Sequence, residues 1–329
     1  MVDDILDAHR DTSAPEEIRL GIARCLLGDK VRYDGGHKLN HYLAEELGRY
    51  VTFVPVCPEL ECGMGVPREP MRLEGDPGAP RLVTHHSKQD LTEQMLAWGR
   101  DRVEELAGEG LCGYVFKTKS PSSGMARIKV HQEKGGPKHT GVGLWARLVM
   151  ERYPLLPCED EGRLNDPKLR ENFIEQVFLF KRLRTLLKQG PNPKELIEFH
   201  TRHKLLVRAH DEQGYRALGK IVARAGQDGM AGLLREYVEL LAASCKRMAT
   251  PRKHANVLYH ALGYFKRNLS PDEKQEAVEL IELYRRERLP LIVPVTLINH
   301  FARKYGETYL LCQHYFHPHP MELMLRNHV

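Results

Sequence analysis

The sequence lacks several features that would place it in a familiar class. It has no apolar run long enough to cross a bilayer, and residues 1–7 are acidic where a secretory signal would be basic. It has no Cys-x-x-Cys pair, which disfavours a zinc site, and no Gly-x-Gly-x-x-Gly turn, which disfavours a dinucleotide fold. We therefore expect a cytoplasmic protein without membrane contact. In that reducing compartment its seven cysteines should serve metal binding, catalysis or burial rather than disulfides.

Length and charge divide the chain into two parts. The 329 residues exceed one ordinary hydrophobic core and predict two domains. Residues 1–160 carry a net charge of about −4 and residues 161–329 one of about +9. The second half is therefore the better candidate for a nucleic-acid surface, although a basic excess alone is a weak signal.

A buried-strand pattern between Val51 and Val56 runs directly into four reactive side chains. The β-forming residues of this run predict a strand, and Cys57, Glu59, Glu61 and Cys62 follow it. In open α/β sheets, ligands bind at the carboxyl ends of the strands. The segment therefore predicts a site.

Two further predicted strands end in the same way. Residues 19–24 lead to Cys25, and residues 113–116 lead to the loop Lys117–Gly124, which offers hydroxyls, backbone N–H groups and two lysines. Helices are predicted over 41–50, 90–106 and 142–152, a fourth strand near 155–156, and loops over 63–73 and 125–138. This alternation predicts a doubly wound, mostly parallel sheet in which the three loops converge.

The converging cysteines allow two interpretations. A lone cysteine is more often a buried filler than a ligand. Thiolates from distant segments, by contrast, suit an iron–sulfur cluster. The arginines Arg68 and Arg72 in the neighbouring loop face either an anionic ligand or solvent.

The second half reads as all-α, because its apolar residues recur at helical spacing. Ser270 and Glu273 have capping-box spacing, and the last helix is expected over 295–305. His200, His203 and His210 share one helical face. Since no carboxylate or cysteine stands at ligand spacing, we predict packed or RNA-facing histidines rather than metal ligands.

One basic segment of this half also carries aromatic and hydrogen-bonding side chains. Phosphate tracking combined with base stacking requires this mixture. The predicted RNA-binding residues are Arg252, Lys253, His254, Tyr264, Lys266 and Arg267, together with His203 and Lys204.

Three motifs, in order, resemble the signatures of the TudS-type thiouracil desulfidases. They are Cys25-Leu26-Leu27-Gly28 with Arg32-Tyr33-Asp34-Gly35, then Val56-Cys57-Pro58-Glu59, then Lys119-Ser120-Pro121-Ser122 with Gly124. The resemblance covers residues 18–160 and implies a Rossmann-like domain that holds a 4Fe-4S cluster. Residues 165–329 resemble a YbgA-like domain through Phe199-His200 with His203-Lys204, Gly263-Tyr264-Phe265-Lys266 and Leu289–Pro294, and residues 1–17 are left as a mobile tail.

The resemblance implies Cys25 and Cys57 as cluster ligands and places Ser123 where the family has its third cysteine. This departure is serious, because a hydroxyl barely ionises near neutral pH whereas a thiol has a pKa of about 8.5. Three explanations stay open. Ser123 is an engineered substitution, or it is native and Cys62 or Cys112 replaces it as a ligand, or the chain has lost catalysis.

The resemblance also implies Glu61 as the catalytic carboxylate and Ser120 as the catalytic serine, with Glu59 in a structural role. We expect Lys117, Lys119 and Arg68 to bind the substrate.

The fusion of both halves is similar to the RudS-type desulfidases, which convert 4-thiouridine in tRNA to uridine. It predicts hydrolytic exchange of C=S for C=O, with the cluster accepting sulfur at an open iron, tRNA as the partner and no DNA. Two alternatives remain. One is desulfuration of free thiouracil or thionucleosides, and the other is a non-enzymatic RNA-binding or iron–sulfur sensing protein if Ser123 is native.

Overall fold

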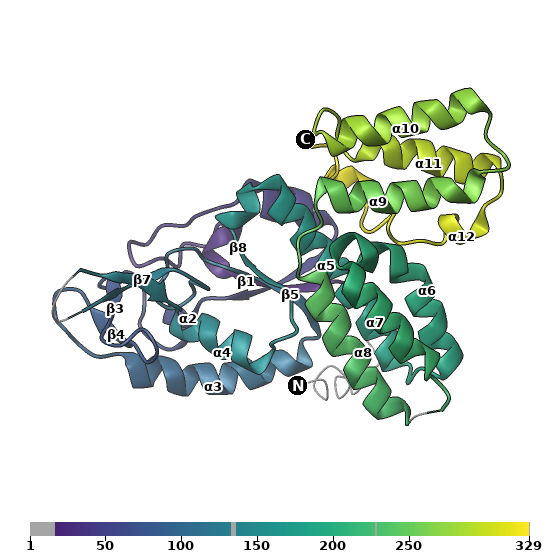
Figure 1. The fold of residues 1–329 in the computed structure, drawn as a ribbon. Coiled ribbons are helices and arrows are strands. Elements are labelled where there is room, and N and C mark those ends of the chain that lie inside the picture. The colour runs from purple at the N-terminus through teal and green to yellow at the C-terminus, as the bar shows by residue number, and fades with distance from the viewer. Residues whose placement is uncertain (1–16, 133–135, 228, 329) are drawn as a thin grey trace. The chain divides into compact units, whose positions relative to one another are not determined.

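The computed structural model describes residues 17–132, 136–227 and 229–328 (Figure 1). Apart from Glu17, the predicted tail at residues 1–17 lies outside the described residues. The chain divides into two compact units, the first ending at Asp166 and the second beginning at Pro167. Within the described ranges, no helix has the length and apolar character needed to span a membrane.

The first unit is built on a parallel sheet with the strand order β2-β1-β5-β8. The strands are β1 (Arg19–Ala23), β2 (Thr52–Val56), β5 (Leu111–Phe116) and β8 (Cys158–Asp160). Because β2 and β5 pair with opposite sides of β1, the chain reverses its progress across the sheet next to β1, and ligands bind at such switch points. The predicted α/β class is confirmed, whereas the fourth strand lies at 158–160 and not near 155–156.

The burial of each strand follows its place in the sheet. β5 is buried along its whole length, as expected for an inner parallel strand. β2 contains Pro55, which is tolerated because β2 is an edge strand. Gly21 in β1 lies against Tyr114 in β5, where an added Cβ would come within 2.2 Å of the ring. Close packing of these two strands therefore requires glycine.

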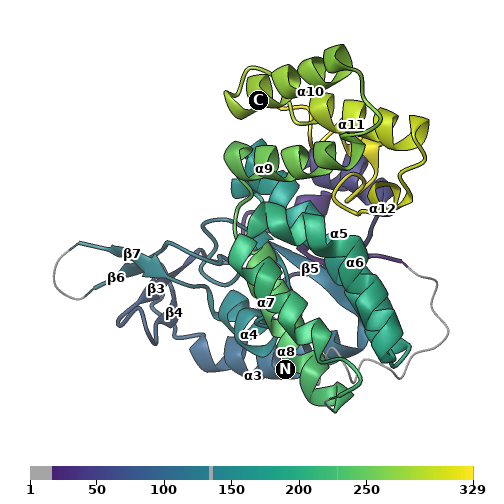
Figure 2. The ribbon, with the colours of Figure 1, turned by 45° about the vertical axis from the view of Figure 1, so that its right-hand side comes forward.

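A second sheet occupies part of the loops that we predicted over 63–73 and 125–138, and residues 63–70 are a loop as predicted. Its order is β4-β3-β6-β7, with β3 (Met71–Glu74), β4 (Arg81–Thr84), β6 (Ile128–His131) and β7 (Lys138–Gly141). Two antiparallel hairpins join through a parallel β3–β6 pair, and Figure 2 shows these four strands grouped apart from β5. The predicted loops are wrong here because four-residue strands with alternating charged residues give no apolar run.

The first unit also has one short helix and two longer helices. The helices are α2 (Pro58–Glu61), α3 (Thr92–Gly108) and α4 (Leu144–Arg152). α3 and α4 pack together through Trp98 and Trp145, whose ring centroids lie 5.0 Å apart, and the Trp145 indole donates to the Tyr114 hydroxyl at 3.0 Å. In place of the helix predicted over 41–50, the chain forms a π-helix (Tyr42–Glu46) and a 3-10 turn (Leu47–Arg49).

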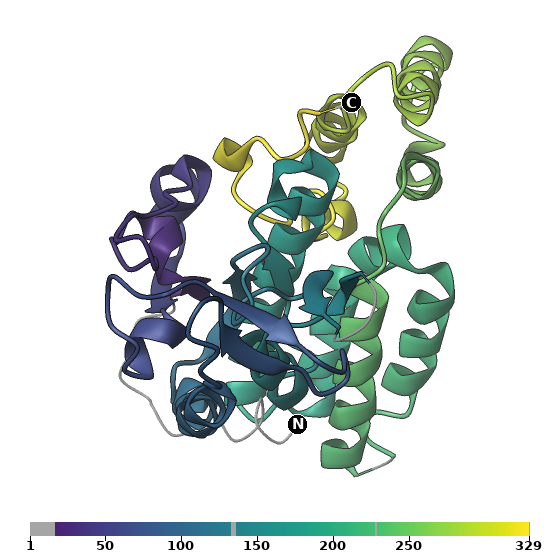
Figure 3. The same ribbon diagram turned by 90° about the vertical axis from the view of Figure 1, so that its left-hand side faces the viewer.

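The second unit is helical, and between Pro167 and His328 the described residues include no ladder strand (Figure 3, green to yellow). Its helices are α5 (Pro167–Lys188), α6 (Pro193–His210), α7 (Glu212–Ala223), α8 (Met230–Cys245), α9 (Pro251–Leu262), α10 (Pro271–Arg285), α11 (Ile292–Lys304) and α12 (Thr308–Leu311). The all-α prediction and the capping box at Ser270 are confirmed. The helix predicted over 295–305 begins at Ile292, with Pro294 in its first turn, where proline is tolerated.

Gly143, just before α4, allows the helix to approach the loop that follows β5. A Cβ at this position would lie 2.3 Å from the Ser122 carbonyl oxygen, and the Gly143 N–H donates to the Gly124 carbonyl at 2.8 Å. Both contacts involve backbone, which cannot move aside as a flexible side chain can.

We predict that Gly143→Ala lowers the free energy of unfolding by about 1–3 kcal/mol, the usual cost of overpacking. Urea denaturation measures this value. Gly108→Ala is the matched control, because an added Cβ there would meet nothing within 4 Å. Equal stability of the two variants would contradict the close approach at Gly143.

Candidate active site

The three loops predicted to converge form one cavity of about 380 Å³ in the first unit. Cys25 follows β1, Cys57 follows β2 and residues 117–123 follow β5, so each contributes from the carboxyl end of a neighbouring strand. The lining also includes Arg32, Glu59 and Arg68. The parallel pairing of β1 with β2 and β5 is what brings these segments together.

Both cysteines of the cavity are thiols of unusually low acidity. Burial raises the pKa of Cys25 to about 11, although Lys117 opposes the shift. Burial also raises the pKa of Cys57 to about 12, and Glu59 adds to this shift. Both sulfurs are therefore protonated at neutral pH unless a cation lies beside them, as a metal would.

The structure tests whether an iron–sulfur cluster fits this donor set. Two thiols line the cavity, as such a cluster requires, but the third position is the hydroxyl of Ser123, which is 4% exposed and lines the same cavity. Two of three donors therefore fit in kind.

Neither proposed replacement for Ser123 reaches this cavity. Cys62 packs against the core around Leu73 and Met95, and its thiol faces the Glu59 carbonyl at 3.5 Å. Cys112 lies buried at the opposite end of β5, about 13 Å of strand before Phe116. The explanation in which one of these cysteines replaces Ser123 as the third ligand finds no support in this conformation.

Of the two carboxylates after β2, the structure brings Glu59 into the cavity and not Glu61. Glu61 turns back along α2, where it accepts from the Cys57 N–H at 2.8 Å and lies 3.4 Å from Arg102. Glu59 lines the cavity and accepts from Ser122. The geometry therefore places Glu59, and not Glu61, at the cavity, while the predicted catalytic role of Glu61 stays a prediction.

A short chain of hydroxyls connects Glu59 with Ser120, which also lines the cavity. The Ser122 hydroxyl donates to Glu59 Oε1, and the Ser120 and Ser122 hydroxyls lie 2.9 Å apart. The Ser123 N–H donates to Ser120 Oγ at 3.1 Å, which fixes Ser120 as an acceptor on that side and leaves its proton for Ser122 or for a ligand. Ser120 therefore lies where a proton could pass between the cavity and Glu59.

The three cations predicted to bind substrate all line the cavity, but they differ in how far they are already paired within the protein. Lys117 is paired with Glu161. Arg68 lies 3.8 Å from Glu59 and donates to the Val31 carbonyl at 3.1 Å, and within the described part of the chain its buried Nε has no hydrogen-bond partner. Lys119 is exposed and has a positive φ of 58°. Arg68 is thus the cation best placed to meet a buried ligand.

Comparisons with known proteins match the two halves separately. The family model for 2-thiouracil desulfurase matches residues 20–161, and a family model described only as a protein of unknown function, DUF1722, matches residues 204–320. The uncharacterized protein YbgA of Escherichia coli strain K12 is 31% identical over 165 residues, which is 50% of this chain and 98% of YbgA. The chain belongs to the YbgA family.

Two other proteins match the chain over less than half its length. The uncharacterized protein YbbK of Bacillus subtilis strain 168 is 28% identical over 150 residues, covering 44% of this chain and 97% of YbbK. A solved structure, the [4Fe-4S]-dependent thiouracil desulfidase TudS, shares 26% identity, covers 46% of this chain and 95% of its own, and superposes with a TM-score of 0.38. The family-model match confirms the resemblance of the first half to the desulfidases at the level of the domain.

In the second unit, the structure exposes some of the predicted RNA-binding residues and buries others. Arg252, Tyr264, Lys266 and Arg267 are exposed, and Lys204 and Lys253 are partly buried. His203 and His254 are 1% and 5% exposed, and His254 faces the Tyr315 hydroxyl at 3.0 Å. Their predicted contact with RNA is therefore wrong for this conformation. The alternative prediction of a packed side chain, made for His200, His203 and His210, is correct for His203.

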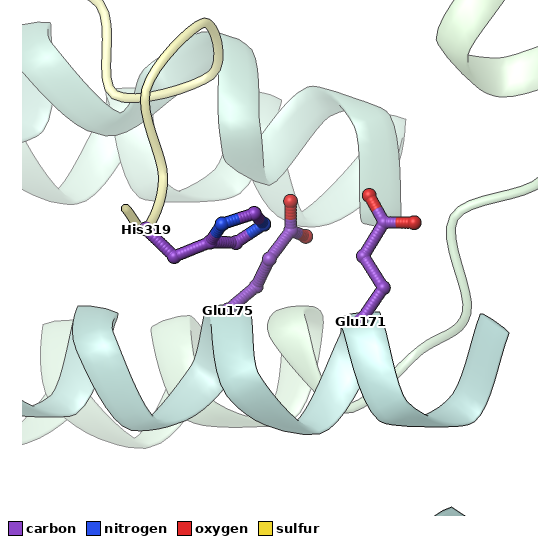
Figure 4. A group of neighbouring side chains, drawn as sticks. All are labelled: Glu171, Glu175 and His319. Atoms are coloured by element: carbon purple, nitrogen blue, oxygen red, sulfur yellow. The ribbon is translucent and has the colours of Figure 1, made fainter. Parts of the chain in front are cut away.

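A second cluster, which the sequence analysis missed, joins α5 to the C-terminal segment. Figure 4 shows Glu171 and Glu175 side by side on α5, with His319 facing them. These side chains could ligate a metal ion, but Arg326 already donates to Glu171 at 3.1 Å and to Glu175 at 2.5 Å. Burial raises the pKa of Glu175, and Arg326 and His210 outweigh that effect, so its pKa is lowered. The guanidinium supplies the positive charge that a metal would bring.

We predict that Arg326→Met lowers the free energy of unfolding by about 3–5 kcal/mol, because it leaves two buried carboxylates without their cation. Guanidinium denaturation measures this loss. Arg202→Met is the control, since Arg202 and its partner Glu198 are both about half exposed. Similar losses in both variants would show that the buried cluster contributes no special stability.

Proposed function

We propose that this protein removes sulfur from 4-thiouridine in tRNA, leaving uridine, with its reaction centre in the first unit. The observation that carries the proposal is the meeting of two thiols, the partly buried Cys25 and the buried Cys57, in one cavity with Glu59 and Ser120, which are linked through Ser122. That cavity belongs to the segment that matches the desulfurase family model. The basic excess of residues 161–329 supports a polynucleotide substrate.

Cys25 and Cys57 would hold a 4Fe-4S cluster, with Ser123 at the position of the missing third thiolate. When bound, the cluster would supply a thiophilic, Lewis-acidic iron for the sulfur that leaves the substrate. The two thiols must lose their protons to bind it, and their raised pKa values make this step depend on the metal's charge.

The chain's own residues would handle the water and the protons. Exchange of C=S for C=O adds one water: its oxygen bonds to the carbon, the carbon–sulfur bond breaks, and the sulfur leaves as sulfide with the water's protons. Glu59 is placed to accept a proton, and Ser120 and Ser122 would pass it along their hydroxyls. Arg68, which lies 3.8 Å from Glu59, would hold that carboxylate in place.

Desulfuration of free thiouracil or a thionucleoside is the second candidate. The cavity of about 380 Å³ favours it, because this volume suits a single base or nucleoside. A tRNA substrate would have to present its thiolated base singly to the same cavity, as enzymes that act on bases require.

Sulfide release from thiolated tRNA and from free 4-thiouridine separates the two substrates. The assay uses the anaerobically reconstituted Ser123→Cys variant, which restores the third thiol. We expect faster turnover of tRNA per unit concentration, because the basic second half contributes binding only to the polynucleotide. Equal efficiency on both would support the free-nucleoside function, and no release from either would refute the desulfidase proposal.

We predict that Ser123→Cys raises cluster occupancy after anaerobic reconstitution, because a thiolate binds iron far better than a hydroxyl. Iron and sulfide analysis, with the visible absorption of the protein, measures the occupancy. Ser123→Ala is the control and should match the unaltered chain. An unaltered chain that already binds a full cluster would contradict the importance of residue 123.

We predict that Glu59→Gln, made in the Ser123→Cys background, lowers kcat by about 10²–10⁴-fold, the range for loss of a general acid–base group. Glu61→Gln should leave kcat close to that of the parent, because Glu61 faces Arg102 and the Cys57 backbone. Both variants are compared for cluster content first. A rate loss confined to Glu61→Gln would return the catalytic role to that residue.

A further inference from the structure

The surface of the second unit contains a cationic cleft of about 480 Å³ between α6, α7 and α9. Arg208, Arg216, Lys253, Asn256 and His260 line it, together with one acidic residue, Glu212. The cleft lies wholly within residues 204–320, the segment that matches the family of unknown function. Nothing in the proposed chemistry of the first unit accounts for it.

The charges of the cleft leave a positive excess. Glu212 accepts from Arg208 Nε at 2.7 Å and from Arg216 at 3.2 Å, so one carboxylate lies between two guanidinium groups. Each guanidinium has five N–H donors in one plane. In the described structure these contacts use one N–H position of Arg208 and two of Arg216. The geometry therefore still suits a ligand that offers several oxygens, such as a phosphate.

His260 lines the cleft and also contacts the exposed ring of Tyr264. The pKa of His260 is lowered, first by burial and then by Arg208 and Lys204. His260 meets the ring of Tyr264 edge to face, with centroids 5.6 Å apart. A neutral ring thus connects the positive cleft with the neighbouring tyrosine.

Tyr264 is an exposed ring on a rigid support. It is 38% exposed, and it stacks on Tyr309 with centroids 5.0 Å apart and planes 19° from parallel. The Lys204 ammonium lies 4.8 Å from the Tyr309 ring centroid and holds this stack from α6. An aromatic ring held in this way, beside cations, is what stacking of a nucleic-acid base requires.

We infer that this cleft binds a single-stranded segment of RNA, with phosphates at Arg208 and Arg216 and one unpaired base on Tyr264. The inference deepens the proposed function and rests on it for the choice of tRNA. An acidic protein segment would use the cations and leave the supported ring without a role. RNA uses both, because its phosphates alternate with flat bases.

The cleft differs from the surface that the sequence predicts. Lys253 donates to the carbonyls of His210 and Met248 at 2.7 and 2.9 Å, so part of its charge is used within the fold. Arg252 and Arg267 are exposed but do not line the cleft. These two arginines therefore provide a matched control of equal charge.

The test measures binding of an unmodified tRNA transcript by full-length protein, using fluorescence anisotropy over a range of salt concentrations. Arg208→Gln with Arg216→Gln should weaken binding at least tenfold. It should also reduce the slope of log K against log salt by about 1.5, since each lost phosphate contact removes about 0.7–0.9. Arg252→Gln with Arg267→Gln should change both values much less. Equal losses in the two double variants, or no loss at the cleft, would overturn the inference.

Tyr264 provides the second measurement. Tyr264→Leu should weaken binding about tenfold without changing the salt slope, whereas Tyr264→Phe should keep the affinity, because it keeps the ring. Equal loss in both variants, or none in either, would refute base stacking. Turnover of free 4-thiouridine is followed in parallel with the same substitutions made in the Ser123→Cys background, and it should not change. Absence of turnover on every substrate would refute the proposed function. The binding measurements would still show whether the cleft binds RNA.

Discussion

The parallel pairing of β1 with both β2 and β5 is the constraint on which the candidate active site depends. In that arrangement Ala23 pairs with Val56, and Ile22 pairs with Val115. Neighbouring strands lie about 4.8 Å apart, so residues that follow these pairs enter the same small volume. The chain distance between Cys25 and Cys57 is therefore irrelevant to their proximity. The hydrogen-bond ladder, rather than any local motif, sets it.

Burial of this edge has a chemical consequence for the thiols. The same packing that brings Cys25 and Cys57 together removes them from water and raises both pKa values. Burial makes the ionised form of a thiol unfavourable unless a positive charge nearby stabilises the thiolate. A metal cluster is the kind of ligand that offers this charge and accepts soft sulfur donors. The protein thus has two features that favour such a group and, in Ser123, one that opposes it.

The sequence predicts those strands and helices whose own hydrophobic pattern shows which of their residues are buried. The apolar runs of β1, β2 and β5 and the helical periodicity of the second half were read correctly, because both patterns are local. The second sheet was missed because Arg72 and Glu74 in β3, and Lys129 in β6, interrupt any apolar run. Its pairing also joins residues more than fifty positions apart. The choice between Glu59 and Glu61 depended on side-chain direction in α2, which spacing alone does not give.

The basic excess of the second half shows a similar limit of residue counting. Arg326 is 4% exposed and neutralises Glu171 and Glu175, so its charge belongs to the core. Lys253 is likewise bonded to backbone carbonyls. A count of basic residues therefore overstates the number of cations that are free at the surface, because the fold uses some of them internally. A surface that binds a polynucleotide needs the remaining cations to lie beside an exposed aromatic ring. In the described structure, Arg208, Arg216 and Tyr264 combine these features.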